Sequence, residues 1–89
     1  MNEKIMIVDD DKDIREVIQV LLSSEGYNVI EASNGKEALE LVDDDTDLII
    51  LDVMMPEMNG YQACVLLREK TKAPILFLTA KGQDSDKTL

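Results

Sequence analysis

The sequence predicts an α/β fold in which a doubly wound parallel sheet carries helices on both faces. Short apolar runs alternate strictly with segments of helical spacing, and within each run successive residues are apolar, as in strands buried on both faces. The expected strands are residues 5–8, 28–32, 48–51 and 74–78. A chain of 89 residues has room for one such domain with a single modest core.

The first strand, 5–8, runs into a polar turn of aspartates, and an amphipathic helix follows. Asp11 or Asp13 is expected to cap the start of this helix, and Gly26 is expected to end it. The apolar residues of this segment recur with the spacing of an amphipathic helix. These residues are Ile14, Val17, Ile18, Leu21 and Leu22.

The second strand, 28–32, has polar ends that suit the edge of a sheet. Asn34-Gly35 opens the second helix, and residues 43–45, all aspartates, form a solvated loop after it. The expected buried side of this helix consists of Ala38, Leu39, Leu41 and Val42.

The third strand, 48–51, leads directly into Asp52, and a loop with Pro56 follows because proline opposes helical continuation. The third helix begins at Asn59-Gly60 and reaches about Lys70. Its expected core stripe is Gly60, Ala63, Cys64 and Leu67.

The fourth strand, 74–78, ends in Thr79, and residues 84–89 read as the first turn of another helix.

Composition narrows the possible functions. A net charge of −10 repels phosphate backbones, so direct binding to nucleic acid is not expected. The chain has no histidine, which is the most common general base and transition-metal ligand. Its one cysteine, Cys64, excludes an internal disulfide and fits a reducing, cytoplasmic setting. No apolar run is long enough to span a membrane.

Chemically useful side chains follow three of the predicted strands. Asp9 and Asp10 follow the first strand, Asp52 the third and Thr79 the fourth. Right-handed crossovers make the first and third strands neighbours, so these groups should share one pocket beyond the carboxyl ends of the strands. Taken singly, each is an ordinary turn or capping residue.

Clustered carboxylates repel one another unless a cation or protons intervene, and oxygen ligands suit Mg²⁺. Asp52 stands alone at its strand end and is the better candidate nucleophile, whereas Asp9 and Asp10 are the better metal ligands. Thr79 can donate a hydrogen bond to a phosphoryl oxygen.

Three segments carry a resemblance to a known family. The sequence resembles bacterial response-regulator receiver domains, and most closely those of the winged-helix transcription-factor subfamily. The segments are Ile7-Val8-Asp9-Asp10, Asp52-Val53-Met54-Met55-Pro56-Glu57-Met58-Asn59-Gly60 and Leu78-Thr79-Ala80. The likeness covers the whole chain in order and implies a flavodoxin-like sheet with strand order 2-1-3-4.

The resemblance also implies a role for each matching residue. Asp52 would accept a phosphoryl group from a sensor histidine kinase, and Thr79 would be the switch hydroxyl. Asp9, Asp10, Asp52 and the backbone carbonyl of Met54 would hold Mg²⁺. Such a module takes part in its own phosphoryl transfer but is not an enzyme with an external substrate.

Residues 1–89 would then be a receiver domain that is incomplete at its C-terminus. Family members continue into a fifth strand and a fifth helix, a segment that carries a lysine facing the phosphoacceptor. Without them the fourth strand is an apolar edge, and such edges recruit partner strands. We therefore expect a dimer or a strand-exchanged oligomer.

Two alternatives stay open at the level of sequence. One is a Mg²⁺-dependent phosphohydrolase with an aspartyl nucleophile, although that chemistry usually needs an acid two residues later, where this chain has Met54. The other is an inactive interaction module in which the acidic residues only cap helices and solvate loops.

Overall fold

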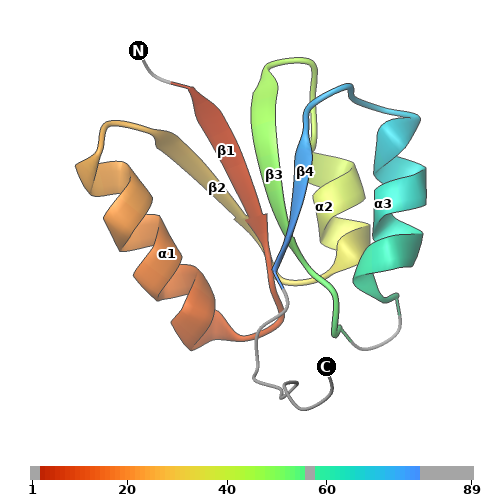
Figure 1. Cartoon of the computed structure of the whole chain (residues 1–89), viewed down its shortest axis with the longest axis horizontal. Coiled ribbons are helices and arrows are strands. Elements are labelled where there is room, and N and C mark those ends of the chain that lie inside the picture. The colour runs from red at the N-terminus through yellow and green to blue at the C-terminus, as the bar shows by residue number, and fades with distance from the viewer. Residues whose placement is uncertain (1–2, 56–57, 79–89) are drawn as a thin grey trace, which may run out of the picture.

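The computed structural model describes residues 3–55 and 58–78, which form a four-stranded parallel sheet and three helices (Figure 1). The strands are β1 (Lys4–Val8), β2 (Asn28–Ala32), β3 (Thr46–Asp52) and β4 (Ile75–Leu78). The helices are α1 (Lys12–Ser24), α2 (Gly35–Leu41) and α3 (Gly60–Arg68). The strand order β2-β1-β3-β4 confirms the expected topology.

The register of the sheet brings the carboxyl ends of the strands to one edge. Val8 pairs with Ala32 on one side and Leu51 on the other, and Asp52 pairs with Leu78. The residue that follows Val8 therefore lies level with Asp52 on the neighbouring strand. Parallel pairing with right-handed crossovers produces this alignment, because every connection returns to the opposite edge before the next strand begins.

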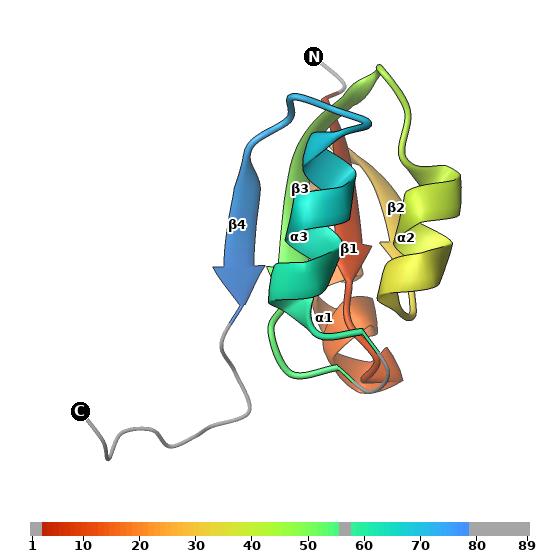
Figure 2. The same cartoon turned by 90° about the vertical axis from the view of Figure 1, so that its right-hand side faces the viewer.

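The main core lies between the sheet and the helices α2 and α3. Figure 2 shows α3 in front of the sheet and α1 behind it. Met6 and Val8 of β1 belong to this core, whereas Ile5 and Ile7 alternate onto the face that α1 covers. The other buried members of the core are Ala32, Ala38, Ile49, Leu51, Met55, Ala63, Leu67 and Ala73.

α1 buries only part of its apolar side. None of its residues is fully buried, and Val17 and Leu21 are 58% and 61% exposed. Ile14, Ile18 and Leu22 are half-buried. The reason is placement: α1 lies over β1 and β2, at one side of the sheet (Figure 1), so only one flank of its stripe meets the strands.

Each helix begins at a side chain that accepts a hydrogen bond from the first turn. Asp11 caps α1, Asn34 caps α2 and Asn59 caps α3 in a reciprocal capping box with Gln62. Gly26 follows the end of α1 with a φ of +97°, which is the left-handed conformation that glycine adopts most readily. The helix starts expected at Asn34-Gly35 and Asn59-Gly60 are confirmed, and Asp11 rather than Asp13 caps α1.

Smaller differences concern the ends and sides of the elements. Leu41, expected inside, is 40% exposed, because the last turn of α2 leaves it beyond the core. β3 begins two residues before the apolar run, at Thr46, whose hydroxyl donates to Asp43 Oδ1. The expected helical turn at 84–89 lies outside the described residues.

None of the helices within residues 3–55 and 58–78 is both long and apolar enough to cross a membrane.

The start of α2 provides a pH-dependent contribution to stability. Glu37 accepts hydrogen bonds from the Ser33 backbone N–H (2.7 Å) and hydroxyl (2.8 Å), and these hold the pKa of its carboxyl below the ordinary 4.5. Because the folded pKa lies below the unfolded one, the stabilisation is present above about pH 4.5 and is lost as the pH falls through the folded value.

We expect Glu37→Gln to lower the free energy of unfolding at pH 7 and to reduce its loss on acidification, because a neutral amide accepts more weakly. Urea unfolding at pH 7 and at mildly acidic pH measures both effects. Glu40→Gln, at an exposed position of the same helix, is the control. An unchanged pH dependence in Glu37→Gln would contradict the assignment.

Candidate metal-binding site

Three carboxylates gather at the edge of the sheet where β1 and β3 end. Asp9, Asp10 and Asp52 each offer one carboxylate oxygen, and these three atoms lie within 4.8 Å of one another. Asp9 and Asp52 are fully buried, whereas Asp10 is exposed. The structure thus brings together the three acids that follow these strands in the sequence. Two of them are buried, and the third faces solvent.

Hydrogen bonds hold the backbone and one carboxylate oxygen of Asp9, and its other carboxylate oxygen is left open. Its backbone N–H donates to the carbonyl of Ala32 (3.1 Å), which extends the pairing of β1 with β2. Its Oδ1 accepts from the N–H of Asp11 (2.8 Å). Its Oδ2 is buried and accepts no hydrogen bond from any described residue. Leaving a buried carboxylate oxygen without a partner is costly, so this atom suits a bound cation.

Asp52 is the last residue of β3 and is fixed by the loop that follows it. Its Oδ1 accepts the backbone N–H of Met54 (3.0 Å). The loop is held in turn by a hydrogen bond from the N–H of Gly60 to the carbonyl of Val53 (3.0 Å). The carboxylate is therefore oriented by a backbone N–H, and its charge lies beside those of Asp9 and Asp10.

The start of α3 approaches the end of β3 so closely that only glycine fits at position 60. A Cβ on Gly60 would lie 2.8 Å from the Cα of Val53 and 3.1 Å from the carbonyl carbon of Asp52. Both are backbone atoms, which cannot turn away as a flexible side chain can. The Asn59-Gly60 pair thus both starts α3 and sets the position of Asp52.

The charges in this cluster demand compensation. Three carboxylates at this separation repel one another, and burial of two of them strengthens the repulsion. Oxygen donors with space for water are the ligands that Mg²⁺ prefers. The donor set and the open Oδ2 of Asp9 therefore fit a hard divalent cation, for which Asp9, Asp10 and Asp52 are the side-chain ligands available.

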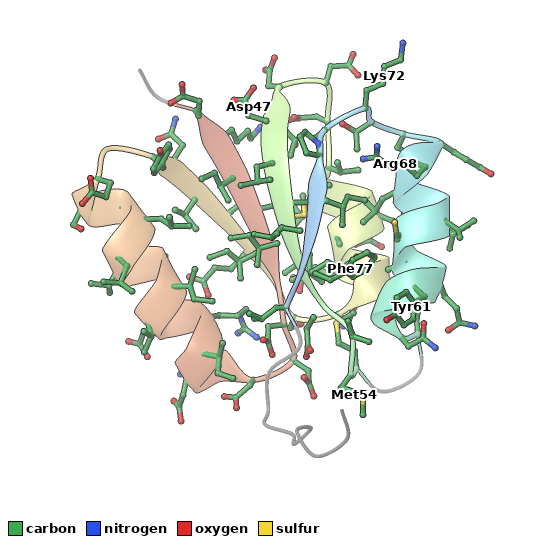
Figure 3. All side chains as sticks on the ribbon, viewed as in Figure 1. Asp47, Met54, Tyr61, Arg68, Lys72 and Phe77 are labelled. Carbon is green, nitrogen blue, oxygen red and sulfur yellow. The ribbon has the colours of Figure 1, made fainter. Side chains whose placement is uncertain are left out.

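Two other residues, Met54 and Thr79, are expected at this site. The backbone N–H of Met54 contacts Asp52, while its side chain is 66% exposed at the end of the molecule where β3 stops (Figure 3). Thr79 lies outside the described residues, so its role stays a prediction.

Sequence reasoning did not single out Arg15. Its guanidinium donates a hydrogen bond to the backbone carbonyl of Asp9 (2.7 Å), one of the residues of the acidic cluster. The available signal was its position in the first turns of the helix that follows the acid pair. The spacing alone did not show that the side chain folds back toward β1 rather than into solvent.

The family model for the response regulator receiver domain matches residues 5–88. The chain is 45% identical over 86 residues to the transcriptional regulatory protein CpxR of Escherichia coli, covering 97% of this chain and 37% of that protein. It is 47% identical over 91 residues to the alkaline phosphatase synthesis transcriptional regulatory protein PhoP of Bacillus subtilis, covering 100% of this chain and 38% of that protein.

The fold is also similar to those of solved receiver-domain structures. The structure of the chemotaxis protein CheY4 of Vibrio cholerae aligns with a TM-score of 0.78 at 34% identity, over 98% of this chain and 76% of that one. The chain belongs to the response-regulator receiver family, a class of non-enzymatic signalling modules. Its similarity to transcriptional regulatory proteins confirms the expected kinship with receivers of transcription factors. The chain spans less than two-fifths of the length of these curated relatives.

Replacing Gly60 by alanine is expected to destabilise the protein by about 1–3 kcal/mol and to weaken Mg²⁺ binding, because the added Cβ pushes the Asp52 backbone away. Gly26→Ala is the matched control: its φ of +97° makes it costly by about 1–2 kcal/mol, but no atom lies within 4 Å of the added group. Thermal unfolding and calorimetric Mg²⁺ titration of both variants measure the two effects. Equal Mg²⁺ affinity in the two variants would contradict the proposed dependence of Asp52 on Gly60.

Proposed function

We propose that this chain is the phosphoacceptor module of a two-component signalling pathway. In this proposal the chain acts in the cytoplasm, where Asp52 takes a phosphoryl group from a phosphohistidine of a sensor kinase, and phosphorylation controls an output, transcription, in a longer regulator. The observation that carries the proposal is the buried Asp52 carboxylate at the end of β3, within 4.8 Å of the oxygens of Asp9 and Asp10. Membership of the receiver family supports the same reading.

The proposed reaction is a transfer between two nucleophiles. An oxygen of Asp52 attacks phosphorus in line with the departing imidazole nitrogen. The new O–P bond gives an acyl phosphate, the N–P bond breaks, and the imidazole keeps the electron pair and takes up a proton. The N–H of Met54 holds Oδ1 of Asp52, which fixes the plane of the carboxylate before attack.

Asp9 and Asp10 would hold Mg²⁺ together with Asp52 and the backbone carbonyl of Met54. When bound, the cation offsets the charge of the incoming phosphoryl group. Asp9 suits direct coordination because its Oδ2 is buried and has no hydrogen-bond partner among the described residues. Asp10 is exposed, so it suits a contact on the solvent side of the cation, where water completes the coordination shell. Thr79 is proposed to donate its hydroxyl to a phosphoryl oxygen after transfer.

The phosphohydrolase alternative is less well supported. An aspartyl phosphohydrolase needs a proton donor near its nucleophile, and the residue two positions after Asp52 is Met54, whose side chain is exposed and carries no acid. Rapid release of inorganic phosphate from an external phosphomonoester would favour that alternative.

Substituting Asp52 by asparagine is expected to abolish formation of an adduct with beryllofluoride or a small phosphodonor in the presence of Mg²⁺. Asp10→Asn should weaken Mg²⁺ binding, because one negative ligand is removed. Asp47→Asn, at an exposed position near the other end of β3, is the control and should behave as the parent chain. Mass spectrometry and fluorine NMR detect the adducts.

Two results would contradict this proposal. An adduct in Asp52→Asn would place the acceptor elsewhere. No Mg²⁺ binding and no adduct in the parent chain would favour the inactive interaction module.

We also propose that the 89-residue chain self-associates through β4. Among the described residues β4 pairs with β3 on one side only, and its sequence is wholly apolar. Leu76 is 57% exposed and Phe77 is 37% exposed, the latter with its ring against Tyr61 (Figure 3). An uncharged strand edge with exposed apolar side chains favours pairing with a second copy.

Sedimentation velocity at increasing concentration is expected to show a dimer or a larger strand-exchanged species. Leu76→Lys should shift the chain toward monomer, because a lysine on an edge strand opposes pairing. Val65→Lys, on the exposed side of α3, is the control for an added charge. A parent chain that stays monomeric at high concentration would overturn self-association without affecting the phosphoacceptor proposal.

A further inference from the structure

We propose that Arg15 is a positioning residue for the acidic site, locking the peptide between Asp9 and Asp10 so that both carboxylates face the cation. This inference rests on the Mg²⁺ site proposed above and assigns a role to a residue outside the ligand set. The inference is carried by two hydrogen bonds from the guanidinium, one to the backbone carbonyl of Asp9 after β1 and one to the side chain of Glu31 on β2.

Arg15 joins three elements, two through its guanidinium and one through its backbone. Its Nη1 donates to the carbonyl of Asp9 (2.7 Å), just after β1, and its Nε donates to Oε1 of Glu31 on β2 (3.1 Å). The backbone N–H of Arg15 donates to the carbonyl of Asp11 in the first turn of α1 (3.1 Å). The Arg15 side chain is 15% exposed, so its bond to the Asp9 carbonyl is partly buried, whereas the bond to Glu31 lies at the surface.

The bond to the Asp9 carbonyl acts directly on the acid pair. That carbonyl belongs to the peptide that links Asp9 to Asp10, so its orientation determines how both side chains leave the backbone. Asp9 is otherwise held through its N–H by Ala32 and through Oδ1 by the N–H of Asp11. With Arg15 in place, each polar group of Asp9 except Oδ2 has a partner among the described residues, and Oδ2 remains for the cation.

The charge of Arg15 and its hydrogen bonds have opposite effects on the affinity of the site for a cation. A positive group beside a cation site repels the cation, whereas a fixed ligand geometry strengthens binding. Glu31 accepts one of the guanidinium N–H groups and offsets part of its charge. If positioning dominates, removal of Arg15 weakens Mg²⁺ binding, and if simple repulsion dominates, removal strengthens it. The sign of the change therefore decides between the two roles.

The experiment measures the Mg²⁺ dissociation constant of the full 89-residue chain by amide NMR shifts during titration with magnesium chloride. Arg15→Gln removes both the charge and the forked donor, and Arg15→Lys keeps the charge alone. Lys12→Gln is the matched control, because it removes the same charge from an exposed position at the start of the same helix. Glu31→Gln tests the second anchor of the guanidinium.

We expect Arg15→Gln to weaken Mg²⁺ binding by about 10-fold or more, the usual effect of losing a group that orients a metal ligand. Arg15→Lys should fall between this variant and the parent, and Lys12→Gln should bind Mg²⁺ as well as the parent or slightly better. Glu31→Gln should weaken binding less than Arg15→Gln, because the bond to the Asp9 carbonyl survives.

Equal or tighter Mg²⁺ binding in Arg15→Gln would overturn the inference. Thermal unfolding without Mg²⁺ separates a purely structural role: a lower melting temperature with an unchanged Mg²⁺ dissociation constant, measured well below that temperature, would also overturn it. Failure of the parent chain to bind Mg²⁺ would instead overturn the proposed metal site, and the two failures are therefore distinguishable.

Discussion

The repulsion among three carboxylates at one edge of the sheet is the constraint on which the rest of this structure depends. Asp9 and Asp52 are fully buried, and their charges lie beside that of Asp10 within 4.8 Å. In water these groups would separate, so the backbone must hold them close to one another before a cation binds. The fold does this through the pairing of β1 with β3, which sets the two strand ends side by side.

Local contacts around the cluster serve the same end. Backbone N–H groups of Asp11 and Met54 each donate to one carboxylate oxygen, which orients the side chains of Asp9 and Asp52. Gly60 lets α3 approach the end of β3, and Arg15 ties the end of β1 to β2. Cluster and fold are thus mutually dependent, because groups that orient the acids also connect the secondary-structure elements.

The two faces of the sheet contribute unequally. α2 and α3 enclose a continuous core with β1 and β3, whereas α1 leaves much of its apolar stripe exposed to solvent. Cohesion in the described part of the chain therefore comes mainly from the α2/α3 side. The acidic site sits where this better-packed layer meets the ends of the strands, which favours a fixed arrangement of ligands over a mobile one.

The sequence by itself determined the elements, their order and the acids that end the strands. Apolar runs such as 48–51 encode strands through local burial, and Asp11, Asn34 and Asn59 encode helix starts through bonds within a few residues. These signals are local, so they can be read without knowing the fold. The family pattern around Asp52 added the expected chemistry.

Only the tertiary structure decided what depends on distant neighbours. The exposure of Val17 and Leu41 depends on how far each helix overlaps the sheet, which no spacing rule states. The hydrogen bond from Arg15 to the Asp9 carbonyl depends on where β2 places Glu31, a residue 16 positions away. Periodicity shows which side of a helix is apolar, but burial requires a partner, and the partner's position is set by packing across the whole sheet.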